Sequence, residues 1–148
     1  MSCTEVVGSG SWVGILQLST DVWLGSLAGR LYVGTADGPK SEIDESSPIG
    51  LLPCLERRYD DVITEIRARE IELSLSSGSL VEKVPLNAIP RVAVDSRLDY
   101  WVQLALDWLA DMPIDAAESE LLAELAREPW ATQRARHRAR SLSGRERR

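Results

Sequence analysis

The sequence predicts an α+β fold, in which an N-terminal antiparallel β-sheet of about five strands packs against a C-terminal cluster of two or three α-helices. Three observations lead to this prediction: a β-type apolar run near the N-terminus, alternating apolar and polar residues in the middle, and a helical apolar stripe that begins at Leu98. Strands that precede helices along the chain are typical of α+β proteins. A chain of 148 residues, 44% of them hydrophobic, is expected to form one domain over residues 1–148, mostly β over 1–97 and helical over 98–142.

The N-terminal region carries the clearest strand signals. The run WVGILQL, residues 12–18, is rich in β-branched and aromatic residues and is followed by the turn-forming residues STD. The next run, VWLGSLAGRLYVG at 22–34, fits either a helical stripe or a pair of strands. Gly25 and Gly29 favour a hairpin, because each interior glycine costs a helix about 1 kcal/mol relative to alanine. Residues 37–48 have the composition of a mobile loop.

The middle of the chain also reads as β structure. After a short helical turn before Tyr59, apolar residues alternate with polar ones over residues 62–75, with one phase slip that indicates a bulge near Arg69. The residues SSGS then predict a hairpin to a second strand at 80–84. A turn between two prolines leads to a last short strand around residues 92–94.

The C-terminal third is predicted to be helical. A wide apolar face extends from Leu98 to Met112 and includes both Trp101 and Trp108, so deletion of either tryptophan is expected to unfold the protein. Asp115 and Glu118 form the pattern of a capping box that begins a second helix. A third helix is expected to begin near Pro129 and to continue to residue 142, followed by a disordered basic tail at 143–148.

The charge is divided sharply along the chain. Residues 127–148 contain eight arginines and two glutamates, a net charge of +6, so the remaining nine basic and 21 acidic residues give residues 1–126 a charge of −12. Such an acidic body is expected to repel nucleic acid and anionic membranes and to attract a basic protein. Without a signal peptide or an apolar run of roughly 20 residues, a soluble cytoplasmic protein is expected, with Cys3 and Cys54 as reduced thiols.

Common catalytic devices have little support in the sequence. The single histidine, His137, lies in the basic end, and no phosphate-binding, dinucleotide-binding or zinc-binding motif is present. Asp60 and Asp61 are expected to point to opposite faces of an extended chain, where they cannot easily share a proton or a metal. Glu70 and Glu72 are interpreted as part of a solvated strand face. We therefore expect no enzyme, no cofactor and no metal site. An unfamiliar active site around Tyr59, Asp60 or Asp95 is the weakest hypothesis.

Acidic residues on the predicted Leu98 helix suggest a binding surface. Asp99, Asp107 and Asp111 lie within about 120° of arc opposite its apolar face. This arc is either an ordinary polar helix face or a docking surface for a basic protein, widened by Glu42, Asp44 and Glu45. The first functional hypothesis is therefore a non-enzymatic protein of the toxin-neutralising, immunity-type or adaptor kind.

The basic C-terminal helix offers a second hypothesis. A nucleic-acid-associated protein could use Trp130 for stacking and four arginines for phosphate contacts, namely Arg134, Arg136, Arg138 and Arg140. The seam of Ala131, Ala135, Ala139 and Leu142 points these arginines in several directions, which does not suit one phosphate-tracking stripe. We therefore favour a helix that packs on the body, with its arginines directed to carboxylates of the same molecule or of a second copy in a homodimer.

Overall fold

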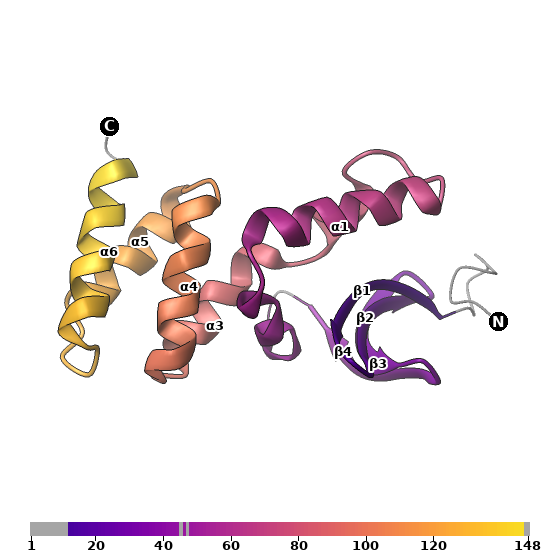
Figure 1. Ribbon diagram of the computed structural model, residues 1–148, viewed down its shortest axis with the longest axis horizontal. Helices are drawn as coiled ribbons and strands as arrows, with labels where there is room; N and C mark the ends of the chain where they lie inside the picture. The colour runs from indigo at the N-terminus through magenta and orange to yellow at the C-terminus, as the bar shows by residue number, and fades with distance from the viewer. Residues whose placement is uncertain (1–11, 45, 47, 147–148) are drawn as a thin grey trace.

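The sheet forms the N-terminal part of the molecule. The computed structural model describes residues 12–44, 46 and 48–146, with side chains only to residue 143 in the last helix (Figure 1). Its strands are β1 (Val13–Ser19), β2 (Val22–Leu27), β3 (Arg30–Thr35) and β4 (Gly38–Ile43), which pair antiparallel in the order β1-β2-β3-β4. The predicted α+β class and N-terminal antiparallel sheet are confirmed, with four strands in the described residues instead of about five.

Two glycines explain why residues 22–34 form a hairpin. The β2–β3 turn places Ala28 and Gly29 at φ values of 53° and 80°, the positive values that a tight type I′ hairpin turn requires. Within β2, a Cβ atom on Gly25 would lie 2.6 Å from the ring of Trp12, which crosses the sheet and donates from Nε1 to the Thr35 carbonyl. Glycine is therefore needed at position 25 because the indole approaches the strand so closely.

The expected loop at 37–48 is largely the edge strand β4. Pro39 and Lys40 lie in this strand, where an edge position tolerates a missing backbone N–H and an exposed charge. The loop prediction was wrong because turn-forming residues also suit an edge strand. The expected position of Glu45 lies outside the described residues.

The middle of the chain is helical, so the strands predicted there were wrong. The elements are η1 (Ile49–Glu56), α1 (Tyr59–Glu72), α2 (Ser79–Lys83), η2 (Leu86–Ala88) and α3 (Ile89–Asp95). In α1 the buried residues are Val62, Ile66 and Glu70, which recur every four positions as on one helix face. The apparent alternation arose because Thr64, which is exposed, happens to fall between two of them.

Glu70 is buried, although the sequence predicted that it lies on a solvated strand face. Its side chain is only 2% exposed, and its carboxylate accepts backbone hydrogen bonds from Gly78 at 2.9 Å, Leu80 at 2.7 Å and Val81 at 3.0 Å. Burial alone would raise the pKa of Glu70, but the three N–H donors lower it below its ordinary value. Glu70 therefore anchors the loop and first turn of α2 to α1.

The C-terminal helices lie where the sequence predicts them: α4 (Asp99–Asp111), α5 (Ala116–Leu125) and α6 (Gln133–Glu146). The capping box is confirmed, since Asp115 accepts from the backbone of Ala117 and Glu118, and the Glu118 side chain accepts from the Asp115 backbone. Helix α6 begins later than expected, where the Thr132 hydroxyl accepts from the Ala135 N–H. Its backbone covers part of the expected tail, and residues 147–148 lie outside the described region.

Helix α4 connects two hydrophobic clusters. One lies between the sheet, η1, α1 and α3 and includes Trp108, while the other lies among α4, α5 and α6. Tyr59 packs against both. Figure 1 shows the sheet at one end, α5 and α6 at the other, and α4 between them. That residues 1–148 form one folding unit remains a prediction.

Candidate protein-binding groove

A groove runs beside α4, and two of the three helix aspartates that the sequence singled out lie on it. It has a volume of about 370 Å³ and separates α4 from residues 55–58, which are the end of η1 and the two residues that join it to α1. Its lining residues are Leu55, Glu56, Arg57, Arg58, Leu104, Asp107, Trp108, Ala110 and Asp111. The α4 side follows from helix geometry, because Leu104, Asp107 and Asp111 recur at intervals of three and four residues and so share one face.

The floor of the groove is apolar and well fixed. Trp108 is 1% exposed and its Nε1 donates to the Arg57 carbonyl oxygen at 2.7 Å. Its ring also meets Tyr59 edge to face, with 5.2 Å between centroids. Leu55 is buried beside it, and Leu104 is half-buried. Leu104 is therefore the accessible part of this floor, and the buried Trp108 and Leu55 hold it in a fixed position.

The rim carries charges of both signs. Glu56, Asp107 and Asp111 contribute carboxylates. Arg57 is directed away to Glu65 and to the Gln17 carbonyl. Arg58 lies 3.9 Å from an Asp111 oxygen, and its side chain is 71% exposed, so this ion pair is long and solvated. The carboxylates are the groups on this rim that can accept a cation from outside.

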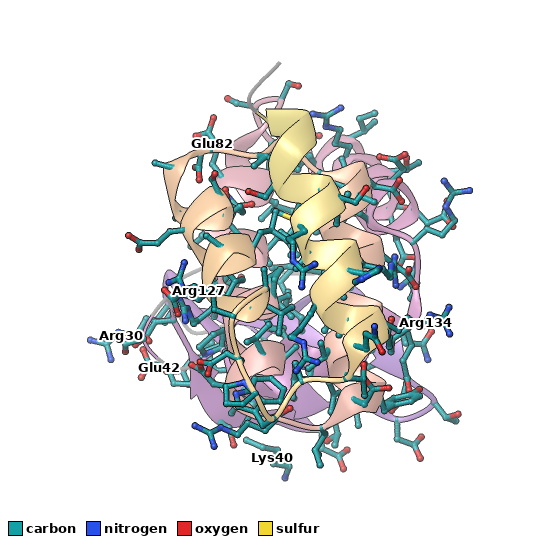
Figure 2. All side chains as sticks on the ribbon, turned by 90° about the vertical axis from the view of Figure 1, so that its left-hand side faces the viewer. Arg30, Lys40, Glu42, Glu82, Arg127 and Arg134 are labelled. Carbon is teal, nitrogen blue, oxygen red and sulfur yellow. The ribbon has the colours of Figure 1, made fainter. Side chains whose placement is uncertain are left out.

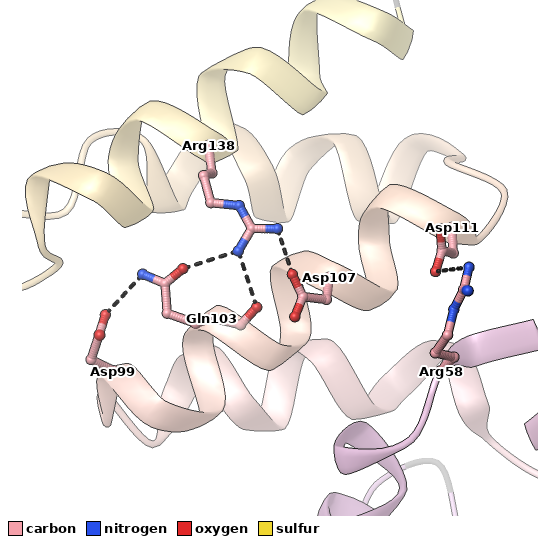
Figure 3. Close-up of polar contacts among 6 residues, drawn as sticks. All are labelled: Arg58, Asp99, Gln103, Asp107, Asp111 and Arg138. Atoms are coloured by element: carbon pink, nitrogen blue, oxygen red, sulfur yellow. Dashed lines mark hydrogen bonds and ion pairs between the residues drawn. The ribbon is translucent and has the colours of Figure 1, made fainter.

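The α4 aspartates also have partners within the molecule (Figure 3). Arg138 Nη2 donates to Asp107 at 2.7 Å, and its Nη1 donates to the side-chain and backbone oxygens of Gln103. Asp99 accepts from Gln103 Nε2 and from the Thr132 hydroxyl, both at 3.2 Å. Asp99 therefore belongs to the contact between α4 and α6, whereas the Asp107 side chain remains 60% exposed at the groove.

The acidic residues of β4 lie at a different place from the α4 aspartates. Glu42 forms an ion pair with Arg30 at 3.7 Å, and Figure 2 labels both on the molecule. Glu42 and Asp44 line a second, more open hollow of about 520 Å³ together with Arg30 and Lys83. The two hollows share no lining residue. The acidic docking surface expected from the sequence is thus divided between two sites.

The arginines of α6 also fall into two groups, those that have a partner among the described residues and those that do not. Arg138 pairs with α4, and Arg136 donates to the carbonyl oxygens of Ala131 at 2.9 Å and Glu128 at 3.3 Å. Arg134, labelled in Figure 2, and Arg140 are exposed and have no hydrogen bond or ion pair with other described residues. Among these four, Arg138 is the one that reaches a carboxylate of a residue whose side chain the structure describes. The half-buried Trp130 lies under Arg97, 5.6 Å from the guanidinium carbon to the ring centroid.

The residues considered for catalysis are not gathered at either hollow. Neither is lined by Tyr59, Asp60 or Asp95, and Asp95 pairs with Arg91 at 3.8 Å. Burial raises the pKa of the free Cys54 thiol to about 12, which keeps it protonated and unreactive. Among the described residues, no group of three or more histidine, cysteine or carboxylate side chains is arranged to hold a metal ion.

Comparison with known proteins adds no relative. No family model, curated protein or solved structure matches the chain. Among the described helices, none combines the length and apolar character needed to cross a bilayer. The groove itself is the main guide to function.

Sequence reasoning missed one whole wall of this groove. Residues 55–58 carried no assignable pattern, and their position opposite α4 depends on contacts between residues about 50 positions apart, such as Trp108 with Arg57. The one available signal was the charge-rich run ERRYDD at 56–61, which directly follows an apolar segment.

Proposed function

We propose that this chain is a non-enzymatic binding protein whose groove receives a basic segment of a protein partner. The observation that carries the proposal is the pair of carboxylates of Asp107 and Asp111 on the rim of a groove with an apolar floor. A toxin-neutralising, immunity-type protein and an adaptor are two forms that such a binding protein can take.

The chemistry of the groove suits a long cationic side chain. Arginine and lysine lay their aliphatic stems along apolar surface and keep their charged heads in polar surroundings. Leu104 offers such a surface above the buried Trp108, and Asp107 and Asp111, one helical turn apart, offer oxygens at its edge. A basic segment therefore gains both packing and charge pairing at one place.

The distribution of charge supports the same partner class. Residues 1–126 carry a net charge of −12, which attracts a basic protein over several ångströms before contact and repels polyanions. Nucleic-acid binding by α6 is less favoured, because Arg136 and Arg138 are already engaged within the molecule. Arg134 and Arg140 alone would supply few phosphate contacts.

Calorimetric titration with a defined basic peptide tests this proposal. The probe is acetyl-Gly-Arg-Gly-Gly-Arg-Gly-amide, titrated into the full chain at low salt. Asp111→Asn and Asp107→Asn are each expected to weaken binding about two- to five-fold, as for exposed ion pairs. Glu82→Gln removes the same charge at an exposed position on α2, so it is the matched control and should leave the affinity unchanged.

Two results would contradict the groove as the binding site. The first is an absence of peptide binding at low salt by the folded wild-type chain. The second is an equal loss of affinity in Asp111→Asn and Glu82→Gln, which would indicate a general charge effect. Thermal unfolding of each variant confirms that it is folded.

A further inference from the structure

Tyr100 presents an aromatic ring next to the groove. The residue is 57% exposed, although its ring and hydroxyl each have a contact within the protein. The hydroxyl donates to Glu56 Oε2 at 2.5 Å, and the ring meets Trp101 edge to face, with 5.0 Å between centroids and 77° between planes. The ring is therefore held in place from two sides while much of its surface faces solvent.

Glu56 joins this ring to the groove. It lines the groove, and the hydrogen bond from Tyr100 occupies only part of its capacity, since a carboxylate has about four acceptor positions. The same hydrogen bond raises the pKa of Tyr100, so the hydroxyl stays a donor in neutral solution. An exposed aromatic ring and a carboxylate with free acceptor positions thus lie side by side.

We infer that Tyr100 and Glu56 make the groove selective for arginine over lysine in the basic partner segment. This inference rests on the proposed function. A guanidinium group is planar, so it stacks on an aromatic ring while its N–H groups reach a carboxylate at the ring edge. A lysine ammonium group is a compact, strongly hydrated charge that gains less from this arrangement.

The spacing along α4 describes the partner segment further. Tyr100 precedes Asp107 by seven residues, which is about 10 Å along a helix axis. Two basic side chains three positions apart in a peptide with the polyproline II conformation point to the same side and lie about 9 Å apart. One of them would stack on Tyr100 beside Glu56, and the other would reach Asp107 and Asp111. The selectivity belongs to the first position, because the Tyr100 ring beside its carboxylate is exposed, whereas the Trp108 ring near Asp107 and Asp111 is buried.

Comparison of two peptides tests this selectivity. The first is the arginine peptide described above, and the second is its twin acetyl-Gly-Lys-Gly-Gly-Lys-Gly-amide. The wild-type chain is expected to bind the arginine peptide about two- to five-fold more tightly, the range typical of an exposed cation–π contact. Tyr100→Ala should abolish this preference, whereas Tyr100→Phe should keep it because the ring can still pack on Trp101.

The outcomes separate this inference from the proposed function. Equal affinity of the wild-type chain for both peptides would overturn the arginine preference, while a loss in Asp111→Asn would still support the groove. An unchanged preference in Tyr100→Ala would also overturn the inference. Failure of both peptides to bind the wild-type chain would instead count against the proposed function itself.

Discussion

Arg138 on α6 donates to the carboxylate of Asp107 on α4 at 2.7 Å, so the basic C-terminal helix and the acidic body meet directly at this pair (Figure 3). The two residues are 31 positions apart in the sequence. Asp107 also borders the groove, so the same carboxylate takes part in the fold and is available to a partner. One arginine of the basic C-terminal helix, Arg138, therefore contacts a carboxylate of the acidic part of the same molecule.

Removal of Arg138 is expected to destabilise the protein slightly. Arg138→Ala loses the ion pair with Asp107 and the hydrogen bond to Gln103, and exposed pairs of this kind contribute at most about 1 kcal/mol to the free energy of unfolding. Urea denaturation measures the change. Arg134→Ala is the control on the same helix and should change stability by less than about 0.5 kcal/mol. A larger effect at Arg134 than at Arg138 would show that the pair does not form.

Replacement of Glu70 is expected to lower the free energy of unfolding more than replacement of Arg138. Glu70→Ala leaves three backbone N–H groups near α2 without their acceptor, and unsatisfied buried donors cost about 1–3 kcal/mol. Glu72→Ala, on the same helix but exposed, provides the matched control, because it removes only a solvated ion pair with Arg69 that contributes at most about 1 kcal/mol. Circular dichroism during urea unfolding distinguishes the two variants, and equal stabilities would contradict the anchoring role.

The same residue predicts how stability depends on pH. The pKa of Glu70 is lower in the folded than in the unfolded protein, so the ionised carboxylate contributes stability at pH values above its unfolded pKa. This contribution is lost as the pH falls through the folded pKa. The free energy of unfolding of the wild type should therefore fall more steeply on acidification than that of Glu70→Gln. Parallel curves for the two proteins would exclude this linkage.

Gly25 should not tolerate a side chain. In Gly25→Ala the new Cβ would lie 2.6 Å from the Trp12 ring and 2.7 Å from the Val13 carbonyl oxygen, so the strand or the indole must move. We expect the free energy of unfolding to fall by about 1–3 kcal/mol, as for other overpacked sites. Gly29→Ala meets no atom within 4 Å but keeps a φ of +80°, so it should lose only about 1 kcal/mol through backbone strain. The nuclear magnetic resonance signal of the Trp12 indole N–H should shift in the first variant only.

The two tryptophans of α4 should differ in importance. The sequence predicted that loss of either would unfold the protein, but Trp108 is fully buried in the core and Trp101 is half-buried. Trp108→Ala is expected to lower the free energy of unfolding by about 3–5 kcal/mol, and Trp101→Ala by less. Denaturant midpoints of the two variants test this order, and the reverse order would contradict the packing described for α4.

The sequence predicted those parts of the fold that depend on local patterns. The apolar stripe of α4 and the capping box of Asp115 and Glu118 are local, and both are present, although Leu98, predicted as the first residue of the stripe, precedes the helix and is exposed. Residues 62–75 were predicted as a strand because Val62 and Ile66 fit a period of two as well as a helical period. In the helix, the buried face continues to Glu70, whereas Ile71 is exposed. A buried carboxylate whose partners lie in a later loop cannot be recognised from local alternation.

The candidate site was predicted only in part for a similar reason. The angular positions of Asp107 and Asp111 on α4 follow from the helical period, and both border the groove. The opposite wall, from Leu55 to Arg58, is placed by long-range contacts such as the hydrogen bond from Trp108 to the Arg57 carbonyl. Charge composition suggested that the arginines of α6 face the body, but it could not show that Arg138 reaches a carboxylate while Arg134 does not.

Nuclear magnetic resonance of the tryptophan indole N–H groups, recorded while the arginine peptide is added, tests the central claim most directly. Trp108 forms the floor of the groove, and Trp23 lies on the distant sheet. Binding in the groove predicts a saturable shift of the Trp108 signal that is lost in Asp111→Asn, with the Trp23 signal unchanged. A Trp108 signal that stays in place while the peptide binds, or a shift confined to Trp23, would contradict it.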